Sequence, residues 1–227
     1  MICIALQDLI INVDGSGSVN SESWALVKNF TGELLKRYKS TYYGAEAVHI
    51  GMTLFGNGAI EEDGTISKAV LVSELVADMA AVKTAAAAME HQKGFTNMAQ
   101  GFVLAQKLLQ QRSRKDAQSA IMTISDGKPS FLWETTEKAK ELEEKGIMKF
   151  MVAISEFPGS DEWRLMKDMA TQPANTNTVR VPGFDALQDG GGPFVREAIA
   201  KFCPAAMSPS ATLTMEKARG YLRTNCN

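Results

Sequence analysis

The sequence is poor in the residues that build zinc sites and disulfide-rich scaffolds. It contains three cysteines and two histidines among 227 residues. No two cysteines are spaced as in a C-x-x-C pair, which argues against a zinc knuckle. Cys3, Cys203 and Cys226 lie near the chain ends, a placement that fits a disulfide between the ends better than catalysis. Because the number is odd, one thiol is left over or pairs with another chain, and three unpaired thiols in a reducing compartment are the alternative.

Long apolar runs and an excess of one charge are missing as well. No stretch of about 18 apolar residues occurs, so we expect no transmembrane helix and no direct membrane insertion. The apolar opening, residues 1–13, lacks a basic start and a small-residue cleavage site, and is typical of a strand rather than a signal peptide. Lys and Arg total 24 against 26 Asp and Glu, a net charge of −2, so no nucleic-acid partner is expected. The one basic cluster, residues 112–115, is expected to form a solvated turn at a helix end.

Apolar runs of strand length alternate with stretches of helical periodicity along the chain. The run at residues 9–13 ends in Asp14, and apolar residues then recur at helical spacing over 21–38, with Asn20 or Ser21 as the N-cap. Further strands are predicted at 48–55, 66–72, 120–124, 150–154 and 178–181, and further helices around 79–89 and at 96–111, 134–145, 161–169 and 193–202. The strands at 48–55 and 66–72 are expected to pair as a hairpin, which makes the latter an antiparallel edge.

This β–α alternation with near-continuous apolar strands predicts an α/β fold. We expect a mostly parallel central sheet, with one short antiparallel edge strand, covered by helices on both faces. A chain of this length buries roughly 70% of its unfolded surface, so its core needs no metal or disulfide to hold together. One domain is expected over residues 1–203, followed by a C-terminal tail over 204–227 that is partly extended and has room for a short helix at 214–222.

Oxygen-bearing side chains gather in the loops after two of the predicted strands. Asp14 and Asp126 end the first and fourth major strands, and Ser16 and Ser18 follow Asp14 in the run Asp-Gly-Ser-Gly-Ser. Thr96 opens a later predicted helix and can place a third hydroxyl at the same rim. Ligands bind beyond the carboxyl ends of the strands in such sheets. Two carboxylates and three hydroxyls without histidine suit a hard cation such as Mg²⁺ and argue against zinc.

Three segments resemble the metal-ion-dependent adhesion site (MIDAS) of von Willebrand factor type A (vWA) domains. They are residues 14–18 (DGSGS), 94–97 (GFTN) and 125–129 (SDGKP), and the order of elements agrees with the family from about residue 8 to 203. The resemblance implies a Rossmann-like three-layer αβα sandwich with a divalent cation at its rim, Mg²⁺ first and Mn²⁺ or Ca²⁺ as alternatives. Phe95 stands where the family often has Gly, a departure that alters the rim but removes no ligand.

The resemblance also implies roles for the five candidate residues. Ser16, Ser18 and Thr96 would supply hydroxyl ligands, while Asp14 and Asp126 would act largely through bound water. A metal held mainly by neutral groups keeps an electrophilic position, which an Asp or Glu carboxylate of a partner protein can fill. The implied function is a non-enzymatic adhesion or matrix-type module, outside the cell or on its surface, that binds a protein through this metal.

The family also bears on the cysteines. Several extracellular members join the two ends of the domain by a disulfide, so the resemblance makes Cys3–Cys203 the expected pair and Cys203–Cys226 its competitor.

Two other functions stay open at this point. An apolar strand ending in Asp-Gly-Ser also resembles the opening of haloacid-dehalogenase-type phosphotransferases, but Ser16 replaces the second Asp that serves there as general acid. Alternatively, the chain is a vWA subunit that docks an acidic segment inside a larger structural or intracellular assembly. The identity of the partner, the physiological metal and the oligomeric state are not readable from the residues.

Four further residues are interpreted from their positions. Trp133 follows the loop after Asp126 and is expected either in the core or at the border of the metal face. His91 is expected in a solvated loop, and His49 as a packed or edge residue. Asn29-Phe-Thr is a glycosylation sequon in form, within a predicted helix.

Overall fold

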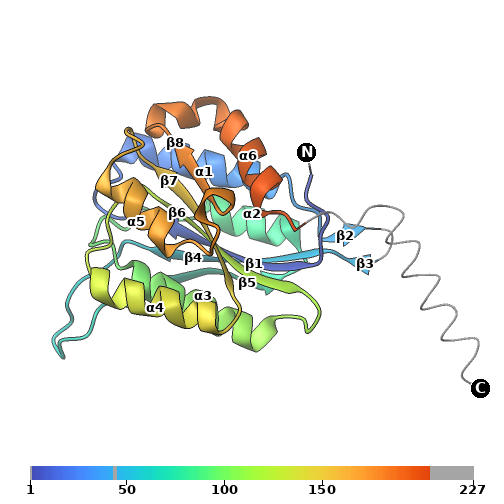
Figure 1. Ribbon diagram of the computed structural model, residues 1–227, viewed down its shortest axis with the longest axis horizontal. Coiled ribbons are helices and arrows are strands. Elements are labelled where there is room, and N and C mark those ends of the chain that lie inside the picture. Colours follow the sequence, from blue (N-terminus) through green and yellow to red (C-terminus); the bar gives the residue numbers. More distant parts are fainter. Residues whose placement is uncertain (1, 43–44, 205–227) are drawn as a thin grey trace, which may run out of the picture.

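The computed structural model describes residues 2–42 and 45–204, and it shows a central sheet covered by helices on both faces (Figure 1). The predicted short helix at 214–222 and Cys226 lie outside these residues. Six strands form the sheet in the order β5-β4-β1-β6-β7-β8. They are β1 (Gln7–Asp14), β4 (Val48–Phe55), β5 (Val70–Val76), β6 (Gln118–Ser125), β7 (Met148–Ile154) and β8 (Thr178–Val181), and a separate two-stranded ladder joins β2 (Thr41–Tyr42) to β3 (Ala45–Glu46).

The sheet is parallel except at one edge, as predicted. Strand β5 runs antiparallel to β4, while β1, β4, β6, β7 and β8 pair in parallel. The edge strand begins at Val70 rather than at residue 66. Residues 59–67 fold back on themselves instead, with a bridge between Ile60 and Ile66, so the apolar residue at 66 closes a loop.

Helices cover both faces and complete the predicted three-layer sandwich (Figure 1). One face carries α1 (Ser21–Leu35), α2 (Met79–Ala87) and α6 (Gly192–Phe202); the other carries α3 (Met98–Arg112), α4 (Leu132–Glu144) and α5 (Asp161–Met169), and the 3₁₀ segments η1 (Ala174–Thr176) and η2 (Phe184–Gly190) flank β8. Asn20 caps α1 by accepting a hydrogen bond from the Ser23 amide. The helix ends at Leu35, short of residue 38, because Tyr38 pairs with Cys3 in an isolated bridge. Within 2–42 and 45–204, no helix has the length and apolarity to cross a bilayer.

Two apolar cores, one on each face of the sheet, hold these layers together. All eight residues of β1 are buried, since helices press on both of its faces. Phe30 and Leu34 of α1 are fully buried on one side, and Phe102 of α3 on the other. Each such side chain contributes roughly 1.5–3 kcal/mol by leaving water. The strand ends that carry Asp14 and Asp126 are therefore set on a rigid base.

A disulfide joins Cys3 to Cys203, which confirms the expected pair. It links the segment before β1 to the residue that follows α6, 200 positions apart in the sequence. By restricting the unfolded chain, a crosslink over so long a loop contributes up to roughly 5 kcal/mol to stability.

The basic segment at residues 112–115 lies at the end of α3 and is exposed as expected at Arg112, Ser113 and Lys115, whereas Arg114 departs from the expected solvated turn. The Arg114 guanidinium lies 2.7 Å from the fully buried Asp8 carboxylate and donates at 2.9 Å to the carbonyl oxygens of Gln7 and Ala47. A buried carboxylate needs a paired and hydrogen-bonded counter-charge. Arg114 thus fastens the amino-terminal ends of β1 and β4 to the loop that precedes β6.

Candidate metal centre

The predicted ligands lie at the carboxyl ends of the two central strands. Strands β1 and β6 are parallel neighbours, with Val13 opposite Ile124, so Asp14 lies beside Ser125 and Asp126 follows one residue on. From β1 the chain builds outward through β4 and β5, and it later returns to the other side of β1 with β6. Such a switch in strand order opens a crevice where α/β proteins bind ligands.

A chain of hydrogen bonds connects four of the five predicted ligands. Asp14 Oδ1 accepts a bond from the Ser16 amide at 2.9 Å. The hydroxyls of Ser16 and Ser18 are 3.0 Å apart, and Ser18 donates to Asp126 Oδ1 at 2.9 Å. Two carboxylates and two hydroxyls from loops more than a hundred residues apart therefore meet at one point.

Thr96, the fifth predicted ligand, borders the same site. It lines a shallow hollow together with Ser18 and Ser130. Its amide donates to the Ser130 hydroxyl at 3.0 Å, and its carbonyl accepts from the Ser130 amide at 3.0 Å. These bonds fasten Thr96 to the loop that follows Asp126. Helix α3 begins at Met98, so Thr96 precedes the helix instead of opening it.

The loops of the site interlock through close backbone contacts. Gly17 donates its N–H to the carbonyl of Gly94 at 3.0 Å, and Gly94 donates to Gly56 at 2.6 Å. Gly56 has φ of +101°, and a Cβ there would lie 2.2 Å from the Ser16 nitrogen. Any larger residue would both strain the backbone and displace Ser16, which explains the glycine.

Ser125 is a site residue to which the sequence analysis gave no role. It is the last residue of β6, and its hydroxyl donates to Asp14 Oδ2 at 2.6 Å. Together with the Ser16 amide it holds both oxygens of the Asp14 carboxylate. The sequence places Ser125 at the end of a predicted strand directly before Asp126. Its contact with Asp14 could have been predicted only by also knowing that β1 and β6 are neighbours in the sheet.

His91 is packed against the site, contrary to the expectation of a solvated loop. Its ring stacks on Trp24 with centroids 5.3 Å apart, and Nε2 lies 3.2 Å from the carbonyl oxygen of Ser16. The imidazole therefore lies between Trp24 of α1 and the loop after β1, and it supports that loop. The sequence alone does not indicate that residue 91 contacts α1.

Burial dominates the electrostatics of the two carboxyl groups. Desolvation, followed by the nearby charge of Asp126, raises the pKa of Asp14 to about 6, although hydrogen bonds from Ser125 and Ser16 oppose the shift. Desolvation likewise raises the pKa of Asp126, against the hydrogen bond from Ser18. The folded chain thus brings two acidic groups together at an energetic cost that a cation would offset.

The donor set at this position fits a hard divalent ion. Among residues 2–42 and 45–204, no group of three or more His, Cys, Asp or Glu side chains is arranged to hold a metal. A cation here would be bound by hydroxyl and carboxylate oxygens, the ligands that Mg²⁺, Mn²⁺ and Ca²⁺ accept. Its charge would compensate the buried Asp14, which is 1% exposed.

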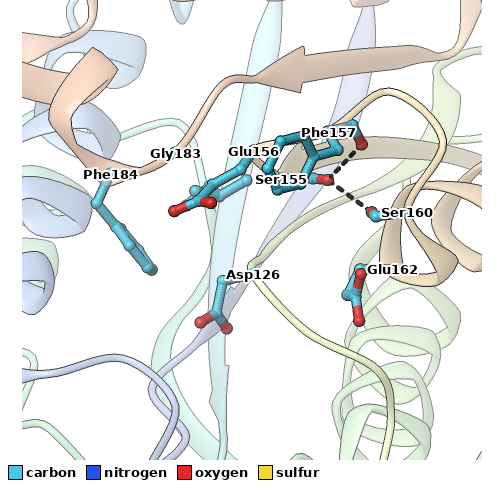
Figure 2. A pocket seen from close by; sticks show the side chains of 9 residues that line it. Asp126, Ser155, Glu156, Phe157, Ser160, Glu162, Gly183 and Phe184 are labelled. Atoms are coloured by element: carbon cyan, nitrogen blue, oxygen red, sulfur yellow. Dashed lines mark hydrogen bonds between the residues drawn. The ribbon is translucent and has the colours of Figure 1, made fainter.

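A second pocket of about 280 Å³ adjoins Asp126 on the side of β7 and α5. Figure 2 shows Asp126 between Glu156 and Glu162, with Phe157 on the rim. Two further carboxylates therefore lie on this flank of Asp126, whereas Ser18, Thr96 and Ser130 line a separate hollow.

Three large aromatic side chains are exposed: Phe95 and Phe157 line the two hollows at the site, and Trp133 lies on α4. Phe95 is 58%, Phe157 68% and Trp133 72% accessible to solvent. The core placement considered for Trp133 is therefore wrong, because helix α4 begins at Leu132 with this side chain turned outward.

Comparison with known proteins places the fold in a family. The model of the von Willebrand factor type A domain matches residues 8–190. Human (Homo sapiens) integrin alpha-X is 24% identical over 189 residues, which cover 81% of this chain and 15% of the integrin. The chain thus spans only a small part of that relative's length.

Two solved structures have the same architecture. Proximal thread matrix protein 1 from the mussel byssus, with a zinc-occupied MIDAS motif, has a TM-score of 0.64 at 17% identity, covering 87% of this chain and 49% of that one. Manganese-loaded Plasmodium vivax TRAP protein has a TM-score of 0.61 at 20% identity, covering 86% of this chain and 75% of that one. Together with the match over residues 8–190, these likenesses show that the chain belongs to the von Willebrand factor type A domain family.

Proposed function

We propose that this chain is a divalent-cation-dependent protein-binding module. It would hold Mg²⁺ through Ser16, Ser18 and Thr96, with Asp14 and Asp126 acting largely through bound water, and recognise an Asp or Glu of a partner. The observation that carries the proposal is the hydrogen-bonded chain Asp14–Ser16–Ser18–Asp126 at the switch point of the sheet. The bound ion would supply an electrophilic position that a carboxylate can occupy.

The protein's own residues keep this position available. Ser125 and the Ser16 amide bind the two oxygens of Asp14, so that its carboxylate is held in place at the base of the site. Three of the five proposed ligands are neutral hydroxyls, which leave part of the ion's charge uncompensated. An acidic partner side chain would be attracted by that remaining charge.

The surroundings of the site suggest how a partner approaches. Glu156 and Glu162 flank Asp126 on one side and would repel an acidic group there. The hollow bordered by Ser18 and Thr96 carries no such charge, and the exposed ring of Phe95 lies at its edge. We therefore propose that the carboxylate enters from this hollow while apolar partner atoms cover Phe95.

The comparisons support the class of function. Zinc in the byssus protein and manganese in TRAP support a divalent ion, and the hard oxygen donors suit Mg²⁺, Mn²⁺ and Ca²⁺, of which we propose Mg²⁺ first. vWA domains of integrins and adhesion proteins are generally non-enzymatic, and we propose the same for this chain. The integrin and byssus relatives, with the disulfide, favour an extracellular or cell-surface setting.

Calorimetric titration with Mg²⁺ and Mn²⁺ tests the metal. Wild type is expected to bind, and Asp14→Ala to lose binding. Asp116→Ala is the matched control, since it removes an equal charge from an exposed residue far from the site. Capture of partners from native extract, with and without EDTA, then tests the mechanism. If the wild type still captures a partner in EDTA, and Asp14→Ala captures it as well, the metal bridge is contradicted. That result would support the alternative of a subunit that docks into an assembly through another surface.

A further inference from the structure

We propose that Asn29 is an N-glycosylation site and that its glycan lies over a hollow between α1 and α2. Residues 29–31 (NFT) are the only Asn-x-Ser/Thr sequence in the entire chain. The metal centre makes no use of this sequon, which lies on α1.

The exposure of the sequon residues fits a modified asparagine. Asn29 is exposed on α1, whereas Phe30 and Thr31 are fully buried beneath it. A sugar on the Asn29 amide would therefore project into solvent without disturbing the core. The two buried residues anchor the helix turn that presents it.

The hollow beside Asn29 has the shape and chemistry to accept the first sugar. It measures about 360 Å³ and is lined by Gly32, Lys83 and Ala87 along with Asn29 itself. Gly32 has no side chain, and a Cβ added there would meet nothing within 4 Å, so the space above Gly32 in this hollow is unoccupied by protein atoms. The ammonium group of Lys83 is a donor for sugar hydroxyls.

The buried hydroxyl of Thr31 constrains when the modification occurs. It donates to the carbonyl oxygen of Val27 at 2.8 Å within α1, and it has no exposed surface. A transferase that recognises Asn-x-Ser/Thr must contact this hydroxyl. The transfer therefore precedes the formation of α1, on the newly made chain.

The reaction is a balanced group transfer from a lipid-pyrophosphate-linked oligosaccharide. A bond forms between Asn29 Nδ2 and the anomeric carbon of the sugar, while the bond from that carbon to the pyrophosphate oxygen breaks. The lipid pyrophosphate leaves with the electron pair, and Nδ2 loses one proton. The Cys3–Cys203 disulfide is consistent with the oxidising secretory compartment in which this chemistry takes place.

A glycan at this position leaves the metal centre open. Asn29 lies nine residues after the N-cap Asn20, which corresponds to roughly 13 Å along the helix from the end that faces the site. The hollow at α2 and the hollow at Ser18 have no residue in common.

The test expresses all 227 residues behind a secretion leader in cultured human cells. Mass spectrometry then examines the peptide containing Asn29, from both lysate and medium. We expect a glycopeptide that peptide-N-glycosidase in heavy-oxygen water converts to labelled Asp. Asn29→Gln should abolish the mass shift and Thr31→Ser should retain it. A mostly unmodified Asn29 peptide in the disulfide-bonded protein would overturn the proposal.

Two further measurements test the timing and the placement. Purified oligosaccharyltransferase should modify the reduced, denatured chain but not the folded chain made without a glycan; equal modification of both would overturn the timing. Acetylation of Lys83 should rise when the glycan is removed enzymatically, while the distant, exposed Lys115 stays unchanged. Equal labelling of Lys83 before and after removal would overturn the placement over the hollow.

Discussion

Each end of strand β1 buries an Asp carboxylate, but the two ends differ in what compensates its charge. Asp8 near its start is fully buried and Asp14 at its end is 1% exposed. Asp8 is paired with the guanidinium of Arg114, which the chain itself supplies. Asp14 is held by the hydroxyl of Ser125 and the Ser16 amide, with the second acidic group, Asp126, close by.

This contrast separates a structural charge from a functional one. At the amino end the positive partner is built in, so the carboxylate is compensated whenever the chain is folded. At the carboxyl end, the donors that bond to Asp14 and Asp126 within residues 2–42 and 45–204 are neutral, and we expect compensation to come from outside.

Removing the built-in cation should be the most damaging change. Arg114→Met would leave Asp8 buried without a counter-charge and lower the free energy of unfolding by roughly 3–5 kcal/mol. Urea denaturation measures the loss, and Mg²⁺ should not restore it. Arg112→Met is the control, because Arg112 is 57% exposed and its Glu74 contact is 3.9 Å long. Equal effects of the two changes would contradict the structural role of Arg114.

The metal-free protein should lose stability as pH rises through the range of Asp14. Burial raises the folded pKa of Asp14 from 3.8 to about 6, so between these values the folded state holds the proton more tightly than the unfolded state. Stability from this group is therefore complete below about pH 4 and is lost by about pH 6, a change of roughly 3 kcal/mol. Urea denaturation of the wild type in EDTA over this pH range, compared with the same series for Asp14→Asn, isolates the contribution of Asp14 to the free energy of unfolding. A difference curve that is flat between these pH values would contradict the shift.

Adding the external cation should have the next largest effect. At about a hundred times its dissociation constant, Mg²⁺ should stabilise the wild type at pH 7 by roughly 2.7 kcal/mol. Asp14→Asn should gain much less, whereas a variant at the exposed Asp116 should gain as much as wild type. Thermal unfolding with Mg²⁺ or EDTA measures this. A Mg²⁺ effect that survives in Asp14→Asn would place the binding elsewhere.

The smallest effect is expected from one neutral donor. Ser125→Ala removes the 2.6 Å hydrogen bond to Asp14 and should destabilise the metal-free protein above pH 6 by about 1 kcal/mol. It should also raise the pKa of Asp14, because that bond favours the charged form. Ser113→Ala, at the exposed end of α3, is the control. An unchanged pH midpoint in Ser125→Ala would show that the hydroxyl does not act on Asp14.

The fold was largely predictable because its signals are local. Continuous apolar runs marked the buried strands, and helical periodicity marked their covering helices; even the antiparallel edge was foreseen, although β5 begins later than expected. The five candidate ligands were found because Asp14 and Asp126 follow strands, which places them at one edge of a parallel sheet. Their role in metal binding stays a prediction.

The supporting contacts were not predictable because they join distant parts of the chain. Nothing in residues 112–115 indicates a buried carboxylate at Asp8, and the stacking of His91 on Trp24 depends on how a loop returns to α1. Ser130, which fastens Thr96, lies in a loop whose local sequence specifies only a turn. Such partners are determined by packing rather than by periodicity.

The Cys3–Cys203 disulfide has a mechanical consequence. It connects the chain just before β1 directly to the chain just after α6, so the whole sandwich lies inside a covalent loop. Tension applied from outside these two positions passes through the sulfur atoms and bypasses the sheet. The domain therefore cannot be extended from its two ends while that covalent loop is closed.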